Sequence, residues 1–102
     1  MKIKLLPAAS EDLMDGFRFY DRQLEGLGEY FLDSLYSDIE SLRISAGVHE
    51  IRFGRFHRLL SKRFPFAIYY QLIASEIRVI AVLDSRRNPA WLQQQVSGRS
   101  RR

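Results

Sequence analysis

The stretch KRFPFAIYYQLIASEIRVIAVLD, residues 62–84, is the most apolar part of this 102-residue chain. Residues 66–73 and 77–83 are rich in β-branched and aromatic side chains, and the short polar segment 74–76 separates them. This pattern predicts two strands joined by a hairpin loop. Apolar residues occupy both alternating faces of 77–83, so this segment is predicted to be a central strand that is covered on both sides.

Upstream of this stretch, the apolar residues recur every three or four positions, which predicts two amphipathic helices. The segment Gly26-Leu27-Gly28 separates the two helices, so they are expected to form a hairpin. Gly16 lies near the apolar stripe of the first helix, where we expect it to allow close helix packing. The stripe of the first helix comprises Ala9, Leu13, Phe17, Tyr20 and Leu24, and that of the second comprises Phe31, Leu35, Ile39 and Leu42.

The remaining segments complete an α+β fold. Residues 2–6 alternate in polarity and predict a short strand, which its lysines place at an edge of the sheet. A further strand is expected at 56–62, after a loop or irregular strand at 48–55. The predicted order is β-α-α-β-β-β, a helical hairpin packed on one face of a three-stranded antiparallel sheet that follows the N-terminal strand. We expect residues 1–102 to form a single domain, with a short helix at Trp91 and a disordered tail at 97–102.

Composition and charge limit the possible functions. The chain has no cysteine, which excludes disulfides, thiolate catalysis and cysteine-ligated zinc. Residues 1–43 contain nine acidic and five basic residues, a net charge of −4, whereas 44–102 contain three and eleven, a net charge of +8. The basic half is expected to meet an anionic partner. Without a membrane-length apolar run or a signal peptide, the chain is expected to be soluble and cytoplasmic.

Few motifs with a specific chemistry are present. No glycine pattern matches a nucleotide-binding loop, and His49 and His57 lack the spacing of metal ligands, so we expect no metal and no cofactor. Glu11, Asp12 and Asp15 group on the first helix, and a solvated helix face explains them better than acid–base chemistry.

One group of basic residues could form a binding surface. Arginine forks bind phosphate oxygens bidentately, and basic groups near a scissile phosphate can stabilise developing charge. Two strands and a loop could bring these side chains together. The alternative, an ordinary arginine-rich surface, stays open. For Tyr69 and Tyr70 we favour one ring in the core and one outside over a role in base stacking. The basic group comprises Arg52, Arg55, Arg58, Lys62, Arg63, Arg86 and Arg87.

Several short motifs resemble a known family. RFPFAIYY at 63–70, VIAVL at 79–83 and RRNP at 86–89 closely resemble the C-terminal half of the RelE/ParE toxin superfamily. The resemblance covers nearly residues 2–92, and the order of elements predicted above agrees with that family's fold. Its helical hairpin is matched by Ala9, Glu11-Asp12-Leu13, Tyr20, Gly26-Leu27-Gly28 and Phe31-Leu32.

The resemblance implies the toxin of a bacterial type II toxin–antitoxin module. Its partner would be a ParD-like antitoxin whose extended C-terminal segment wraps the toxin, and operator DNA would be met only through that antitoxin. These motifs most closely resemble those of ParE, which implies inhibition of DNA gyrase by binding and no catalytic residues. The residues expected to bind partners are Arg58, Lys62, Arg63, Arg86, Arg87 and Trp91.

Two alternatives accompany this interpretation. One is a RelE-like nuclease that cleaves mRNA on the ribosome with Lys62, Arg63 and Arg86; no tyrosine follows Trp91 to transfer a proton. The other is an inactive relative that only binds its antitoxin.

Overall fold

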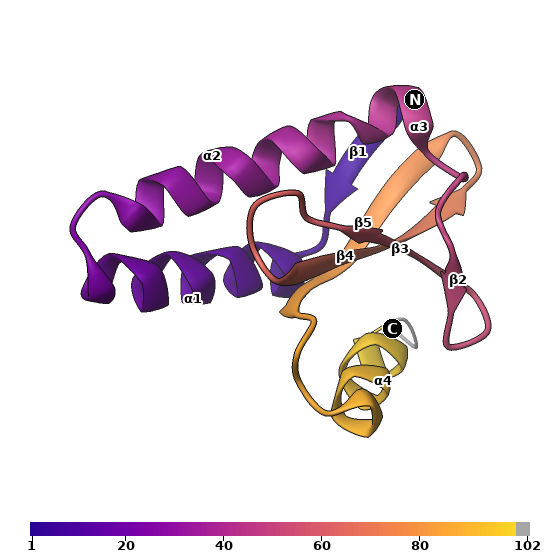
Figure 1. The fold of residues 1–102 in the computed structure, drawn as a ribbon. Coiled ribbons are helices and arrows are strands. Elements are labelled where there is room, and N and C mark those ends of the chain that lie inside the picture. Colours follow the sequence, from indigo (N-terminus) through magenta and orange to yellow (C-terminus); the bar gives the residue numbers. More distant parts are fainter. Residues whose placement is uncertain (100–102) are drawn as a thin grey trace.

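A five-stranded mixed sheet forms the centre of the computed structural model, which describes residues 1–99 (Figure 1). The strand order is β1-β5-β4-β3-β2, so β5 and β4 are flanked on both sides. Most of β5 and the first five residues of β4 are buried, as expected for central strands, whereas the end of β4 is exposed. The strands are β1 (Lys2–Leu5), β2 (Ile51–Arg52), β3 (Phe56–Leu60), β4 (Phe66–Ile73) and β5 (Glu76–Asp84).

The α+β class and the edge position of β1 are confirmed, but the predicted three-stranded antiparallel sheet is wrong in detail. β1 runs parallel to β5, with Lys2 opposite Glu76 and Leu5 opposite Val79. The helical hairpin supplies the long crossover that parallel pairing requires. At the other edge, β2 adds only two residues to β3, which is the irregular strand expected within 48–55.

The helical hairpin covers one face of the sheet. It consists of α1 (Pro7–Gln23) and α2 (Leu27–Glu40), and the single turn α3 (Leu42–Ser45) follows. A Cβ atom at Gly16 would collide with the Phe31 ring, so this glycine does allow the helices to pack closely. The core on this face contains the predicted stripe of the second helix, and Ala9, Leu13 and Tyr20 from that of α1, together with residues of β4 and β5. Leu24, predicted in the first stripe, lies after the end of α1 and is exposed, and Phe17 is only partly buried.

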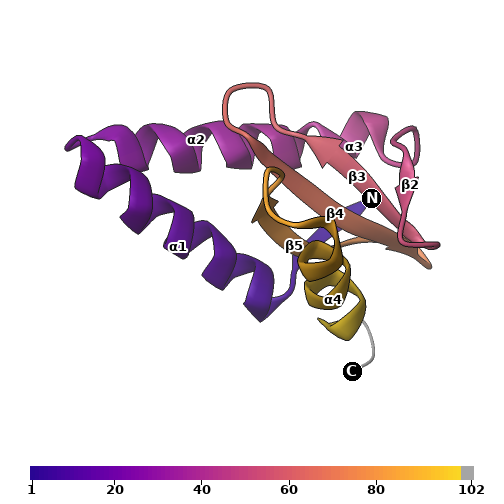
Figure 2. The ribbon, with the colours of Figure 1, turned by 60° about the horizontal axis from the view of Figure 1, so that its bottom comes forward.

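A fourth helix, α4 (Pro89–Arg99), covers the opposite face (Figure 2). Asn88 accepts a hydrogen bond from the N–H of Ala90 at 2.8 Å and so caps the helix, and Pro89 occupies its first turn. Leu92 and Val96 are buried against the sheet. The sequence predicted a shorter helix and a disordered tail from residue 97; the helix continues through Arg99, and residues 100–102 lie outside the described part.

The two covered faces change the interpretation of the tyrosine pair. Tyr70 lies in the core under the helical hairpin, and Tyr69 lies in the core under α4. Both side chains are buried, so the expectation that one would be outside was wrong. Because neighbouring residues of a strand face opposite sides, a second covering helix is sufficient to bury both rings.

Candidate interaction site

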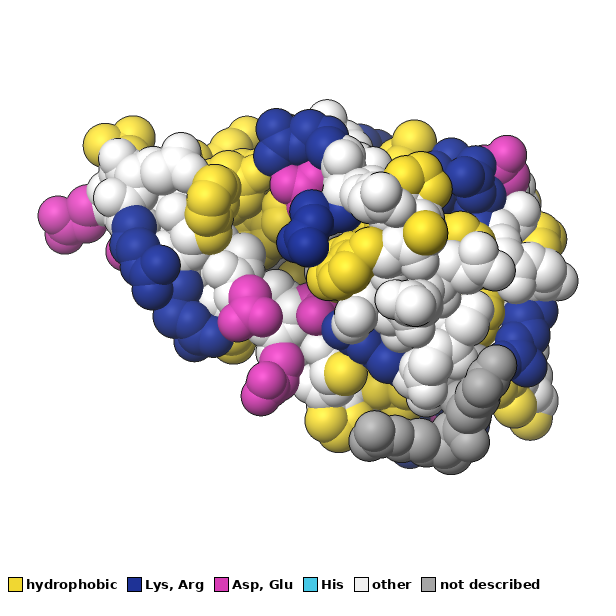
Figure 3. Space-filling model, turned by 90° about the horizontal axis from the view of Figure 1, so that it is seen from below, with side chains coloured by type: hydrophobic (Ala, Val, Ile, Leu, Met, Phe, Trp, Pro, Cys, Tyr) yellow, Lys and Arg dark blue, Asp and Glu magenta, His cyan; other side chains and the backbone are white. Residues whose placement is uncertain are grey.

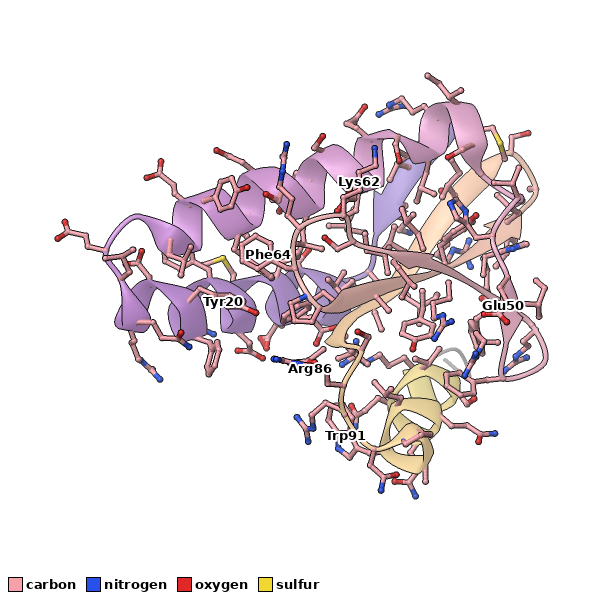
Figure 4. All side chains as sticks on the ribbon, in the orientation of Figure 1. Tyr20, Glu50, Lys62, Phe64, Arg86 and Trp91 are labelled. Carbon is pink, nitrogen blue, oxygen red and sulfur yellow. The ribbon has the colours of Figure 1, made fainter. Side chains whose placement is uncertain are left out.

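The structure divides the predicted basic group between two ends of the molecule. Arg58 lies on β3, opposite Tyr69 of β4, and donates a hydrogen bond to Glu50 at 2.9 Å. Glu50 is far from Lys62 and Arg86 in Figure 4. Arg58 therefore does not share a surface with the other predicted residues, because it precedes the end of its strand whereas they follow strand ends.

Lys62, Arg63, Arg86 and Arg87 all lie at the other end of the sheet, but on two sides of it: Lys62 and Arg63 precede β4, Arg86 and Arg87 follow β5, and Figure 4 shows Lys62 and Arg86 apart with Phe64 between them. Phe66 at the start of β4 pairs with Asp84 at the end of β5, and the N–H of Ser85 donates to the carbonyl of Pro65 at 2.8 Å. The loop before β4 and the segment after β5 therefore leave the sheet side by side. We call this part of the molecule the basic end; it comprises Lys62, Arg63, Arg86 and Arg87.

An aromatic cluster anchors the loop before β4 to the helical hairpin. The Phe64 ring lies 4.9 Å from that of Tyr20 and 5.6 Å from that of Tyr30, measured between centroids. Figure 4 shows Phe64 and Tyr20 beside each other between the loop and the helices. The guanidinium of Arg63 lies 5.9 Å from the centre of the half-exposed Tyr30 ring. The basic loop is thus fixed on the hairpin by ring contacts.

Arg86 and Arg87 have different environments although they are neighbours. Arg86 donates two hydrogen bonds to the carboxylate of Asp84, at 3.0 and 2.7 Å, and these bonds lower the pKa of Asp84. Arg87 instead lies 3.8 Å from the centre of the Trp91 ring. Within residues 1–99 no carboxylate forms an ion pair with Lys62, Arg63 or Arg87, so these three cations can meet an anionic partner.

A groove of about 430 Å³ lies beside the basic end, between α1 and α4. Its lining combines apolar residues of the sheet with Phe19 of α1 and Trp91 of α4, and it includes Arg87 and several carboxylates. Figure 3 looks onto this side of the molecule, where hydrophobic and charged side chains surround the hollow. The lining residues are Asp12, Asp15, Gly16, Phe19, Phe66, Val82, Leu83, Asp84, Arg87, Trp91, Gln95 and Arg99.

Asp12, expected on a solvated helix face, is instead buried at the base of this groove. Its carboxylate accepts hydrogen bonds from the Val82 N–H at 2.9 Å and from the Arg99 guanidinium, including one of 3.0 Å. Burial raises the pKa of Asp12, although these two partners act in the opposite direction. The sequence carried a signal for this position, because residue 12 follows Ala9 by three and lies on the apolar face of α1.

At the opposite end of the sheet, Arg58 and Arg52 form ion pairs with Glu50. Glu50 accepts from Arg58 and, at 3.4 Å, from Arg52. Burial raises the pKa of Tyr69, and the nearby Arg58 and Arg52 lower it only in part. The Nε atom of Arg58 is buried and has no hydrogen-bond partner within the described chain. These cations are therefore less available to a partner than those of the basic end.

The two histidines lie on the hairpin side of the sheet, around Tyr70. The Tyr70 hydroxyl accepts a hydrogen bond from the Gly47 N–H at 2.9 Å and lies 2.5 Å from Nδ1 of His49. The His57 ring stacks on Tyr70, and its Nδ1 donates to the carbonyl of His49 at 2.9 Å. Burial, with His57 nearby, lowers the pKa of His49. This cluster ties the α3–β2 connection to the sheet.

Comparison with known proteins gives a strong structural likeness. No protein-family model and no curated protein sequence matches the chain. A solved structure of the chromosomal ParDE TA (toxin–antitoxin) system from P. aeruginosa superposes with a TM-score of 0.71 and 17% sequence identity, over 80% of this chain and 92% of that one. The fold is ParE-like. The expected resemblance is thereby confirmed at the level of fold.

Of the six predicted partner-binding residues, Arg87 and Trp91 are in contact. Lys62 and Arg63 lie in the loop before β4, and Arg86 follows β5 at the same end of the sheet. Sequence analysis missed Tyr30 and Phe19, whose rings are about half exposed. It also missed Glu50 as the partner of Arg58. Among residues 1–99 there is no cluster of three or more potential metal ligands, and none of the helices there has the length and apolar character needed to cross a membrane.

Proposed function

We propose that this chain is the toxin of a type II toxin–antitoxin module, that it inhibits DNA gyrase by binding, and that a ParD-like antitoxin neutralises it in the cytoplasm. The observation that carries the proposal is the superposition on the ParDE structure over most of both chains. The 17% identity leaves the target to be argued from the site.

The arrangement of the basic end supports binding over catalysis. A nuclease built on Lys62, Arg63 and Arg86 would need a group that transfers a proton. Arg86 is already paired with Asp84. His49 and His57 both contact Tyr70 or each other, and they lie before and on β3, away from these residues. The exposed cations and rings of the basic end are of the types enriched where proteins bind proteins.

A gyrase supercoiling assay with the purified toxin tests the proposal. Loss of supercoiling, with cleaved DNA visible after protein digestion and reversal by the antitoxin encoded beside it, is the expected result. If folded toxin leaves gyrase unaffected, the gyrase proposal fails. mRNA cleavage on translating ribosomes would then support the nuclease, and the absence of any toxicity would support the inactive relative.

A further inference from the structure

The loop between β3 and β4 presents two of the cations of the basic end. Of its residues 61–65, only Lys62 and Arg63 are exposed, and neither forms an ion pair with a carboxylate of residues 1–99. The backbone hydrogen bonds at the ends of the loop, such as that from the Ser61 N–H to the Phe66 carbonyl at 2.9 Å, do not involve these two residues. Their position therefore depends on side-chain contacts of the residues beside them.

Two such contacts hold the loop, one on each side of its cations. After the cations, the Phe64 ring lies 5.1 Å from the Phe31 ring, measured between centroids. Before them, the Ser61 hydroxyl donates a hydrogen bond to the Asp38 carboxylate at 2.7 Å. Phe31 and Asp38 both lie on the buried face of α2. The loop is thus attached to α2 at two points, with Lys62 and Arg63 between them.

Asp38 is an uncommon residue for the buried face of a helix. Its exposed fraction is 6%, and burial of a carboxylate is costly unless hydrogen bonds compensate for it. Ser34, one turn earlier on α2, is also buried, and its hydroxyl has no hydrogen-bond partner within the part of the chain that the structure describes. Well-packed apolar side chains are often at least as stabilising as buried charged groups. We therefore attribute the Asp38–Ser61 bond to the selection of one loop conformation.

The hydroxyl partner of Asp38 also preserves the charge of the loop. A lysine or arginine paired with Asp38 would hold the loop equally well, but that cation would no longer be available to a partner. The Ser61 hydroxyl donates to the carboxylate instead, and Lys62 and Arg63 stay exposed. A loop that is already ordered loses less conformational freedom when it binds, which favours affinity.

We propose that Asp38 is a positioning residue of the basic end: through Ser61 it holds Lys62 and Arg63 in the orientation in which they meet the target. This inference rests on the proposed function, because it takes these two cations as groups that bind the target. Asp38 itself is buried and acts only through the loop. Loss of its bond to Ser61 should therefore loosen the loop and weaken binding together.

Trypsin measures the freedom of the loop, because it can cleave after Lys62 and Arg63 only when the loop opens. Ser61→Ala breaks the bond without changing any charge, and Ser61→Thr keeps the hydroxyl as a conservative control. We expect fragments that end at Lys62 or Arg63, identified by mass spectrometry, to form about tenfold faster or more in Ser61→Ala, as for the loss of a hydrogen bond to a charged group. Cleavage after the exposed Arg22 of α1 should keep its rate, and Ser61→Thr should match wild type.

Inhibition of gyrase provides the second readout. The toxin concentration for half inhibition should rise about tenfold in Ser61→Ala and in Asp38→Ala, because two long side chains must then be ordered on binding. Ser61→Thr should restore the wild-type value. Asp33→Ala removes an exposed acidic side chain from the same helix and should inhibit as wild type does.

The outcomes separate the positioning role from the proposed function. If the loop of Ser61→Ala is cleaved at the wild-type rate, Asp38 does not fix the loop and the inference is wrong. If the loop is cleaved faster but half inhibition is unchanged, the bond serves stability alone, which also overturns the positioning role while the proposed function stands. If the wild-type chain leaves gyrase unaffected, the proposed function fails, and the positioning role fails with it even where trypsin shows a loosened loop.

Discussion

Asp12 on α1 and Arg99 at the end of α4 form a doubly hydrogen-bonded ion pair across 87 positions of sequence. Arg99 also donates to the carbonyl of Ile80 at 3.2 Å, and Asp12 accepts from the N–H of Val82. The pair therefore joins both covering layers to the central strand β5. We therefore expect it to contribute, together with the buried Val96, to how firmly the end of α4 is docked.

Replacing Arg99 by Met should destabilise the protein substantially. The change leaves the buried Asp12 carboxylate without its cation, and breaking a buried pair costs about 3 to 5 kcal/mol. Urea unfolding at neutral pH measures the loss. The double variant Asp12→Leu with Arg99→Met removes both charges and should recover most of it; a double variant as unstable as the single one would contradict this account.

Two glycines in helices should respond in opposite directions to alanine. Gly16→Ala drives a methyl group into the Phe31 ring, and overpacking of this kind costs about 1 to 3 kcal/mol. At Gly98 in α4 a Cβ would meet nothing within 4 Å, so Gly98→Ala should stabilise by about 0.5 to 1 kcal/mol through helix propensity. Thermal unfolding measures the change in stability of each variant. A Gly16→Ala variant as stable as wild type would show that α1 and α2 can move apart at little cost in free energy.

The His49 cluster should make stability depend on pH below neutrality. The folded-state pKa of His49 is lower than its ordinary value of 6.5, so the unfolded chain takes up a proton first as the pH falls. The contribution of His49 to stability is therefore complete above pH 6.5 and decreases as the pH falls from there toward the folded-state pKa.

His49→Asn isolates this effect, because the amide oxygen can take the place of Nδ1 beside the Tyr70 hydroxyl without titrating. The urea midpoint of the variant should change less between pH 7 and pH 5 than that of wild type. If the urea midpoint changes equally with pH in the two proteins, His49 does not cause the pH dependence.

Arg86→Ala should separate a binding toxin from a catalytic one. Arg86 is two-thirds exposed and its pair with Asp84 lies at the surface, so the change should have little effect on stability. For an inhibitor that binds, the concentration needed for half inhibition of gyrase should rise gradually. For a nuclease, loss of a group that stabilises the transition state should reduce the cleavage rate by a factor of about 100 or more.

The parts of the fold that sequence predicted correctly have strong periodic patterns. β4 and β5 were recognised because apolar residues cover both of their faces, and the hairpin because its stripes extend over several turns. The pairing of β1 was missed since four residues specify a strand but not its neighbour. The length of α4 was predicted too short, because the polar run Gln93-Gln94-Gln95 separates its buried residues Leu92 and Val96.

The site was predicted less completely for a geometrical reason. Lys62 and Arg63 share one end of the sheet with Arg86 and Arg87 because β3 and β5 both pair antiparallel with β4 and so end at the same side. Arg58 has the same residue type but lies inside a strand, so its register with Tyr69 sets its position. The aromatic support of the basic end and the groove depend on packing between α1, the loop and α4, which no local pattern encodes.

The parallel pairing of β1 with β5 has a consequence for the synthesis of the protein. Leu5 leaves the ribosome early, but its partner Val79 follows 74 residues later, which at typical translation speeds is about 4 to 15 seconds. The fold cannot close until β5 has emerged, and α4 cannot dock before that. A nascent chain therefore presents neither the complete groove nor the loop and β5 ends that carry the basic residues until nearly the whole chain has been made.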